Sequence, residues 1–155
     1  MSEDSLRNLS FPDERENTII FQSEDVEFEL TDQQRLAEWI NKVISQEKCT
    51  LSFLNFIFCS DDFLHELNVA YLQHDTLTDI ITFPFCDPPR IEGEIYVSID
   101  RVQENAALYH APFAEELHRV MIHGVLHLCG QGDKTEAEKG QMRAKEDEAL
   151  ALLGE

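Results

Sequence analysis

The run Thr50-Leu-Ser-Phe-Leu-Asn-Phe-Ile-Phe-Cys59 is the most apolar stretch of the sequence. Its density of aromatic and aliphatic side chains and its length of about ten residues favour a strand that is buried on both faces. A strand with two buried faces lies in the interior of a sheet. We therefore predict that this strand is central and that the other elements pack around it.

Shorter stretches with strand patterns lie on both sides of this run. Residues Thr18 to Phe21 and Ile80 to Phe83 are short apolar runs, and Gly93 to Ile99 alternates apolar and polar side chains. Val26 to Leu30 alternates apolar and acidic residues with a period of two, which is typical of a half-buried strand. These stretches supply the neighbours that the central strand needs.

Helix signals fill most of the remaining sequence. They consist of apolar residues at intervals of three and four, with a capping residue or a proline at the start. Trp39 falls near the edge of the apolar face of the first helix, and Pro112 opens the fourth. The predicted helices are Gln33 to Glu47 after a cap at Thr31 or Asp32, Ser60 or Asp61 to about Leu72, Asp100 to Tyr109, Phe113 to Leu128, and Thr135 to Leu153.

Strands followed by helices, without an internal repeat, indicate an α+β fold. We predict a single domain over residues 1–155, in which a mixed sheet of about four strands is covered by helices. A chain of 155 residues with 43% apolar side chains can bury one hydrophobic core of its own. Residues 1–17, which are polar and charged around a few isolated apolar side chains, are expected to form a loose lead-in.

The cysteines indicate a reducing, cytoplasmic environment. Cys49, Cys59, Cys86 and Cys129 contain no Cys-x-x-Cys pair, and three of them sit in apolar runs. Free thiols are therefore expected, rather than disulfides or a thiolate zinc site. The N-terminus lacks the basic and apolar regions of a signal peptide, and no run reaches the length of a membrane span, so we expect no membrane association.

The stretch His123-Gly-Val-Leu-His127-Leu-Cys-Gly130-Gln-Gly132-Asp133 carries the candidate chemistry. Two histidines four apart on a helix lie about 40° apart around its axis, so both rings can reach one ion. Gly130 can adopt a left-handed conformation at the helix end and turn the chain so that Asp133 approaches the same ion. Two histidines and one carboxylate leave a coordination position open, as in catalytic rather than structural zinc sites.

The residue after the first histidine limits the type of zinc chemistry that this stretch can support. Metalloproteases of the His-Glu-x-x-His type carry their general base there, whereas this sequence has Gly124. Zinc-protease chemistry is therefore not expected. Arg119 lies one helical turn before His123, where it can contact a phosphate near the metal or pair with Glu115 or Glu116.

The overall charge does not favour binding of nucleic acid by the whole surface. The 31 acidic and 12 basic residues give a net charge of −19, whereas proteins that hold the phosphate backbone usually carry a basic face. Because charges are screened over about 8 Å at physiological salt, any basic contact with RNA would have to be local.

Three blocks of the sequence resemble the YbeY family of metal-dependent endoribonucleases and ribosomal RNA maturation factors. The family pattern H-G-x-L-H-L-x-G-x-D-H is similar to the stretch from His123 to Asp133, and G-D-I is similar to Gly93-Glu94-Ile95. The block L-N-x-x-Y-R-x-x-D-x-x-T-D-V-L-S-F-P is similar to residues Leu67 to Pro84. In the family's order and spacing, the resemblance extends from Leu67 through the last helix.

The resemblance implies a zinc-dependent endoribonuclease, specific for single strands, that acts in ribosomal RNA maturation and ribosome quality control. One Zn²⁺ per chain would be held by His123, His127 and Asp133. The nucleophile would be a metal-bound water or the RNA 2′-hydroxyl, and no protein residue is assigned as the catalytic group. The implied partners are ribosomal RNA and the ribosome or ribosomal proteins, and the oligomeric state stays open.

Two departures from the family pattern leave other functions open. The third histidine of the family falls on Asp133, and the arginine after the aromatic residue falls on Leu72. Because arginine is a natural partner of a scissile phosphate, Leu72 favours a second hypothesis: a ribosome-assembly binding protein whose metal is mainly structural. A metallohydrolase for a small non-nucleotide substrate is the third. His74, beside Asp75, is a candidate proton-transfer group or an ordinary solvated loop histidine.

Overall fold

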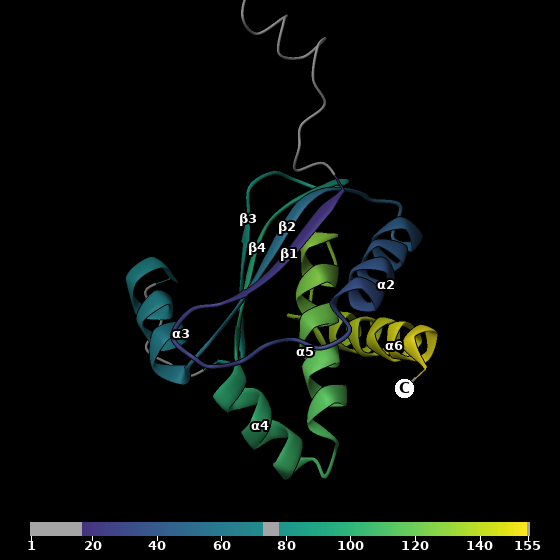
Figure 1. The fold of residues 1–155 in the computed structure, drawn as a ribbon. Coiled ribbons are helices and arrows are strands. Elements are labelled where there is room, and N and C mark those ends of the chain that lie inside the picture. Colours follow the sequence, from purple (N-terminus) through teal and green to yellow (C-terminus); the bar gives the residue numbers. More distant parts are fainter. Residues whose placement is uncertain (1–16, 73–77, 155) are drawn as a thin grey trace, which may run out of the picture.

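The sheet has four strands in the order β1-β2-β4-β3 (Figure 1). The structure is a computed structural model, and it describes residues 17–72 and 78–154. Except for Asn17, the lead-in expected over residues 1–17 lies outside the described residues, and so do His74 and Asp75.

The strand β2 (Thr50–Cys59) is central, as the sequence predicts. It pairs in parallel with β1 (Thr18–Ser23) on one side and with β4 (Arg90–Ser98) on the other. The short edge strand β3 (Ile80–Pro84) pairs antiparallel with β4, so the sheet is mixed. Every residue of β2 after Thr50 is buried, which confirms a strand covered on both faces.

Helices cover the two faces of the sheet unequally. Figure 1 shows α2, α5 and α6 on one side of the sheet and α3 on the other. The main core lies under the three helices, where Phe56 and Ile95 of the sheet and Met121 of α5 are fully buried. The helices are α2 (Gln33–Gln46), α3 (Asp61–Leu67), which continues as the π-helical segment η1 (Asn68–Leu72), α4 (Ile99–Leu108), α5 (Phe113–Leu128) and α6 (Glu136–Leu153). These elements confirm the α+β fold.

Local signals in the sequence fix where several helices begin. The Ser60 hydroxyl accepts a hydrogen bond from the Phe63 N–H at 3.1 Å, and Pro112 occupies the N-cap of α5. At α6, the side chains of Thr135 and Glu138 each accept a hydrogen bond from the backbone N–H of the other, which is a capping box. The capping box fixes the start of α6 directly after the loop that carries Asp133.

The strand predicted over Val26 to Leu30 is absent, and this prediction was wrong. Val26 and Phe28 pack against the core, which accounts for the alternating pattern. The Ser23 hydroxyl donates to the Phe28 carbonyl, so the chain closes on itself and forms a turn after β1 instead of pairing with a strand. The alternating pattern therefore reflected burial of one side of this segment and not pairing with a neighbouring strand.

Two smaller predictions also need correction. Ser98, not Asp100, caps α4, because the Ser98 hydroxyl accepts from the Arg101 N–H at 3.1 Å while Asp100 accepts from the Asp61 N–H at 3.0 Å. Trp39 is not at an edge. Its side chain is buried, and its indole N–H donates to the Ala149 carbonyl at 2.7 Å because α6 covers this side of α2.

All four cysteines are free thiols, as expected, and Cys49 and Cys59 are buried. Among the helices of residues 17–72 and 78–154, none combines the length and the apolar character that a membrane span requires.

Candidate metal centre

The helix α5 places His123 and His127 side by side at the end where it leaves the core. The two ring centroids are 4.7 Å apart, and the side chains are 24% and 29% exposed. Met121 and Val125, which point away from this face, are fully buried in the main core. The core therefore fixes the helix face that carries both rings.

Gly124 lets α5 approach the sheet closely. A Cβ atom built on Gly124 would lie 2.7 Å from Ile80 Cδ1 and 3.1 Å from Ile95 Cγ2. A side chain at this position would therefore require Ile80 and Ile95 to shift or the helix to move away from β3 and β4. Close packing explains why glycine stands where a metalloprotease has its glutamate.

The chain reverses at Gly130, as the sequence predicts. Gly130 has a φ of 103°, its N–H donates to the His127 carbonyl at 3.0 Å, and the Gln131 N–H donates to the Leu126 carbonyl at 3.0 Å. These two bonds form the Schellman motif that commonly ends a helix at a glycine. The turn sends the following residues back towards the histidines.

Asp133 closes the third side of the cluster. Its Oδ2 lies 3.4 Å from His123 Nε2 and 3.3 Å from His127 Nε2. One potential ligand atom from each of the three residues falls within 4.8 Å of the others. Two imidazole nitrogens and one carboxylate oxygen at this spacing could hold a single metal ion.

An open cavity of about 420 Å³ lies over the three side chains. Asn68 and Leu72 of η1 and Thr82 of β3 form part of its wall. Leu72, which stands where the family pattern has arginine, therefore faces the cluster. A ligand that occupies this cavity would contact this wall as well as the three residues.

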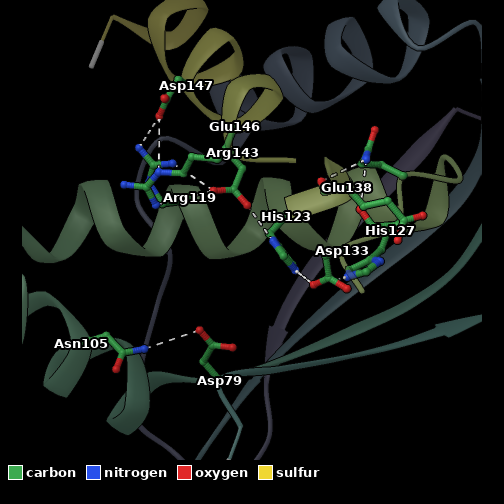
Figure 2. A network of polar contacts seen from close by, with 12 residues as sticks. Asp79, Asn105, Arg119, His123, His127, Asp133, Glu138, Arg143, Glu146 and Asp147 are labelled. Atoms are coloured by element: carbon green, nitrogen blue, oxygen red, sulfur yellow. Dashed lines mark hydrogen bonds and ion pairs between the residues drawn. The ribbon is translucent and has the colours of Figure 1, made fainter. Parts of the chain in front are cut away.

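Asp79 borders the same cavity and is half-buried. Burial raises the pKa of the Asp79 carboxyl above its ordinary value, although the neighbouring His123 acts in the opposite direction. The Asn105 amide donates to Asp79 Oδ2 at 3.5 Å. Figure 2 shows this pair on the side of His123 that faces α4.

A second buried acid contacts the other nitrogen of His123. Glu146 of α6 has an Oε2 atom 2.6 Å from His123 Nδ1, and its side chain is 7% exposed. Burial of the His123 ring opposes protonation, but the hydrogen bond and the negative charge of Glu146 outweigh it, with help from Asp133. The pKa of His123 is therefore raised above its ordinary value.

Arg119 pairs with residues of α6 and not with Glu115 or Glu116. Its two terminal nitrogens lie 2.9 Å from Glu146 Oε1 and 2.8 Å from Asp147 Oδ1. Figure 2 shows this guanidinium above α5 on the far side of Glu146 from His123. The contact with a phosphate proposed for Arg119 stays a prediction, and the observed contacts are with two carboxylates.

Sequence reasoning missed Glu146 as a part of the site, and it weighed Asn68 and Asp79 without assigning them a role. For Glu146 a signal was present, because the buried positions of α6 are Met142, Glu146, Ala149, Leu150 and Leu153. An acid within a buried stripe needs a partner inside the protein. Asp79 and Asn68 lie in the second family block, but a turn Asp and a helix Asn are too common for their position to be read from sequence alone.

Comparisons with known proteins identify the relatives of this chain. The family model described as endoribonuclease YbeY matches residues 18–154. A protein named endoribonuclease YbeY from Amoebophilus asiaticus is 55% identical over 129 residues, which cover 83% of this chain and 88% of the relative. A protein of the same name from Cytophaga hutchinsonii is 48% identical over 139 residues, with 89% and 97% covered.

A solved structure shares the fold. The solution structure of TM1509 from Thermotoga maritima superposes with a TM-score of 0.61 at 29% identity, covering 87% of this chain and 91% of that one. The match of the family model extends over the sheet, the helix α5 and the loop that carries Asp133. The chain belongs to the endoribonuclease YbeY family.

Proposed function

We propose that this chain is a zinc-dependent endoribonuclease that cleaves single-stranded RNA in ribosomal RNA maturation and ribosome quality control. The observation that carries the proposal is the convergence of His123, His127 and Asp133 at the base of an open cavity. The relatives named endoribonuclease YbeY support the RNA-cleaving activity.

The proposed metal is one Zn²⁺ per chain, held by His123 Nε2, His127 Nε2 and an oxygen of Asp133. Imidazole nitrogens suit zinc, and a carboxylate is a common third donor in catalytic sites. Once bound, zinc supplies Lewis-acid chemistry at a phosphoryl oxygen or at a water molecule. The open cavity leaves room for the RNA on the side away from the core.

The residues of the cavity wall would orient the RNA chiefly through neutral groups. Thr78 and Thr82 offer hydroxyl groups, and Asn68 is a further neutral residue of the wall. Among the described residues, the wall of this cavity includes neither lysine nor arginine. Neutral donors can position a sugar or a base, but they do not offset the charge of a phosphate.

Two nucleophiles are compatible with this wall. Attack by the RNA 2′-hydroxyl would leave a cyclic phosphate on one product, whereas attack by water would leave an open phosphate. Mass spectrometry of the ends of a cleaved oligonucleotide distinguishes the two.

The net charge of the chain also favours one class of partner over another. With a net charge of −19, the protein surface complements basic proteins better than naked RNA. We therefore propose that ribosomal proteins help to hold the chain at ribosomal RNA. The free thiols suit the reducing cytoplasm, where we place this activity.

One observation favours a second function, a ribosome-assembly binding protein whose metal is mainly structural. Leu72 faces the cavity at the position where the family pattern has arginine. Without that cation, phosphate chemistry is weakened. If cleavage is limited in this way, Leu72→Arg should raise the rate, and an unchanged rate would remove this argument.

The decisive experiment measures zinc content and cleavage of single-stranded RNA together. Wild type should bind zinc and cleave, and His127→Ala should lose both. His110→Asn is a matched control, because His110 is exposed and has a φ of 54°, a conformation that asparagine tolerates. Undiminished zinc in His127→Ala would refute the metal site, and a zinc-loaded wild type without cleavage would favour the binding protein.

A further inference from the structure

Both ring nitrogens of His123 face carboxylates, but the two surroundings differ. Nδ1 lies 2.6 Å from Oε2 of the buried Glu146, on the side of the ring that faces α6. Nε2 lies 3.4 Å from Asp133 Oδ2, at the cavity that His127 also borders. Figure 2 shows the ring between the two acids. The two nitrogens can therefore have different functions, because Nδ1 contacts Glu146 and Nε2 faces the cavity.

The Glu146 carboxylate is held in place from two sides. Its side chain is 7% exposed, Arg119 donates to Oε1 at 2.9 Å, and His123 contacts Oε2. A buried carboxylate is costly unless both oxygens have partners. Because both oxygens are occupied, the side chain has one preferred orientation, and that orientation aims Oε2 at Nδ1.

An ionised carboxylate only accepts hydrogen bonds, so a neutral His123 ring must carry its proton on Nδ1 to satisfy Glu146. The lone pair then lies on Nε2, which is the nitrogen at the cavity. Histidines that bind metals generally donate their other N–H to such a carboxylate, which fixes the tautomer and strengthens the ligand.

We propose that Glu146, held by Arg119, is a positioning residue that fixes His123 in the Nδ1-protonated tautomer and so presents Nε2 to the metal. The role towards the metal rests on the proposed function, whereas the tautomer is a property of the metal-free chain. Arg119 thereby acts at the site through Glu146. The pair Arg119–Glu146 also joins α5 to α6, so the rim of the site depends on the packing of the last helix.

A purely structural ion pair between α5 and α6 makes a different prediction. Its loss would lower the free energy of unfolding without a change in tautomer or in zinc affinity at temperatures where the protein stays folded. The two readings therefore separate on measurements that do not involve RNA cleavage.

The test uses Glu146→Gln, which keeps the size of the side chain. The amide has one acceptor oxygen for two donors, Arg119 and His123, so its N–H group can turn towards Nδ1. Long-range ¹H–¹⁵N NMR of the histidine rings, on metal-free protein at alkaline pH, should show the Nδ1-protonated form in wild type and a shift towards the Nε2-protonated form in the variant.

Zinc affinity, measured by competition with a chromophoric chelator, should fall about 10- to 100-fold in Glu146→Gln. Glu148→Gln, which removes the same charge from an exposed position of α6, should match wild type in both measurements. An Nε2-protonated His123 in wild type would overturn the inference without any variant. So would a zinc-binding wild type that Glu146→Gln matches in affinity.

A wild type that fails to bind zinc would refute the proposed function. The NMR measurement would still show whether Glu146 fixes the tautomer of His123. The failure of the one is therefore distinguishable from the failure of the other.

Discussion

The two acids at His123 reach it from two unlike regions of the molecule. Asp133 comes from the loop directly after α5, its side chain is 36% exposed, and it faces the cavity. Glu146 comes from the middle of α6, its side chain is 7% exposed, and its other oxygen pairs with Arg119. The buried acid is balanced within the protein, so the exposed acid is the one left to bind a cation.

The largest expected effect comes from changing the exposed acid. Asp133→Ala should abolish stoichiometric zinc binding, because two histidines alone make an incomplete site. Asp133→His should retain zinc, since it supplies the third nitrogen of the family pattern. Elemental analysis after dialysis measures both, with Glu136→Gln, a 95% exposed acid of the next helix, as the control. Full zinc content in Asp133→Ala would break the comparison by showing that this acid does not bind the metal.

An intermediate effect should follow from removing the cation that pairs with the buried Glu146. Arg119→Gln removes the guanidinium that pairs with Glu146 and should lower the free energy of unfolding by about 3 kcal/mol. This is the lower end of the expected range because Arg143 lies 4.0 Å from the same carboxylate. Asp147→Asn breaks only the exposed half of the Arg119 contacts, so it should cost less than about 1 kcal/mol. Urea unfolding measures both, and equal losses would show that burial does not distinguish the two acids.

The smallest effect is the pH dependence of the metal-free protein. The pKa of His123 is raised above 6.5, so the folded chain binds this proton more tightly than the unfolded chain. The resulting contribution to the free energy of unfolding is complete below pH 6.5 and is lost as the pH rises through the raised pKa. Unfolding in urea with a chelator, across this range, should show the decline in wild type and a weaker one in Glu146→Gln. Parallel profiles would indicate that Glu146 does not hold the proton.

The same contrast explains which parts of the site were predictable. The turn at Gly130 and the start of α6 at Thr135 depend on neighbours in the chain, so the sequence places Asp133 near the histidines. Glu146 reaches His123 only because α6 packs across α5, and the pattern of one helix does not reveal what its buried acid will meet. Tertiary packing decided that contact.

The fold shows the same division. The length and apolar density of β2 predict a central strand, and Pro112 predicts the start of α5. The pattern over Val26 to Leu30 misled because burial on one side produces alternation whether or not a strand partner exists. Trp39 misled because the helix that covers it, α6, is far away in the sequence.

The close contact at Gly124 limits the substitutions that this helix can accept. A single substitution to glutamate would create the His-Glu-x-x-His pattern on an existing histidine pair. The new side chain would start 2.7 Å from Ile80 Cδ1, inside the interface with the sheet. A glutamate at this position would therefore require the side chains of Ile80 and Ile95 to shift, so the step towards protease chemistry carries a packing cost at this interface.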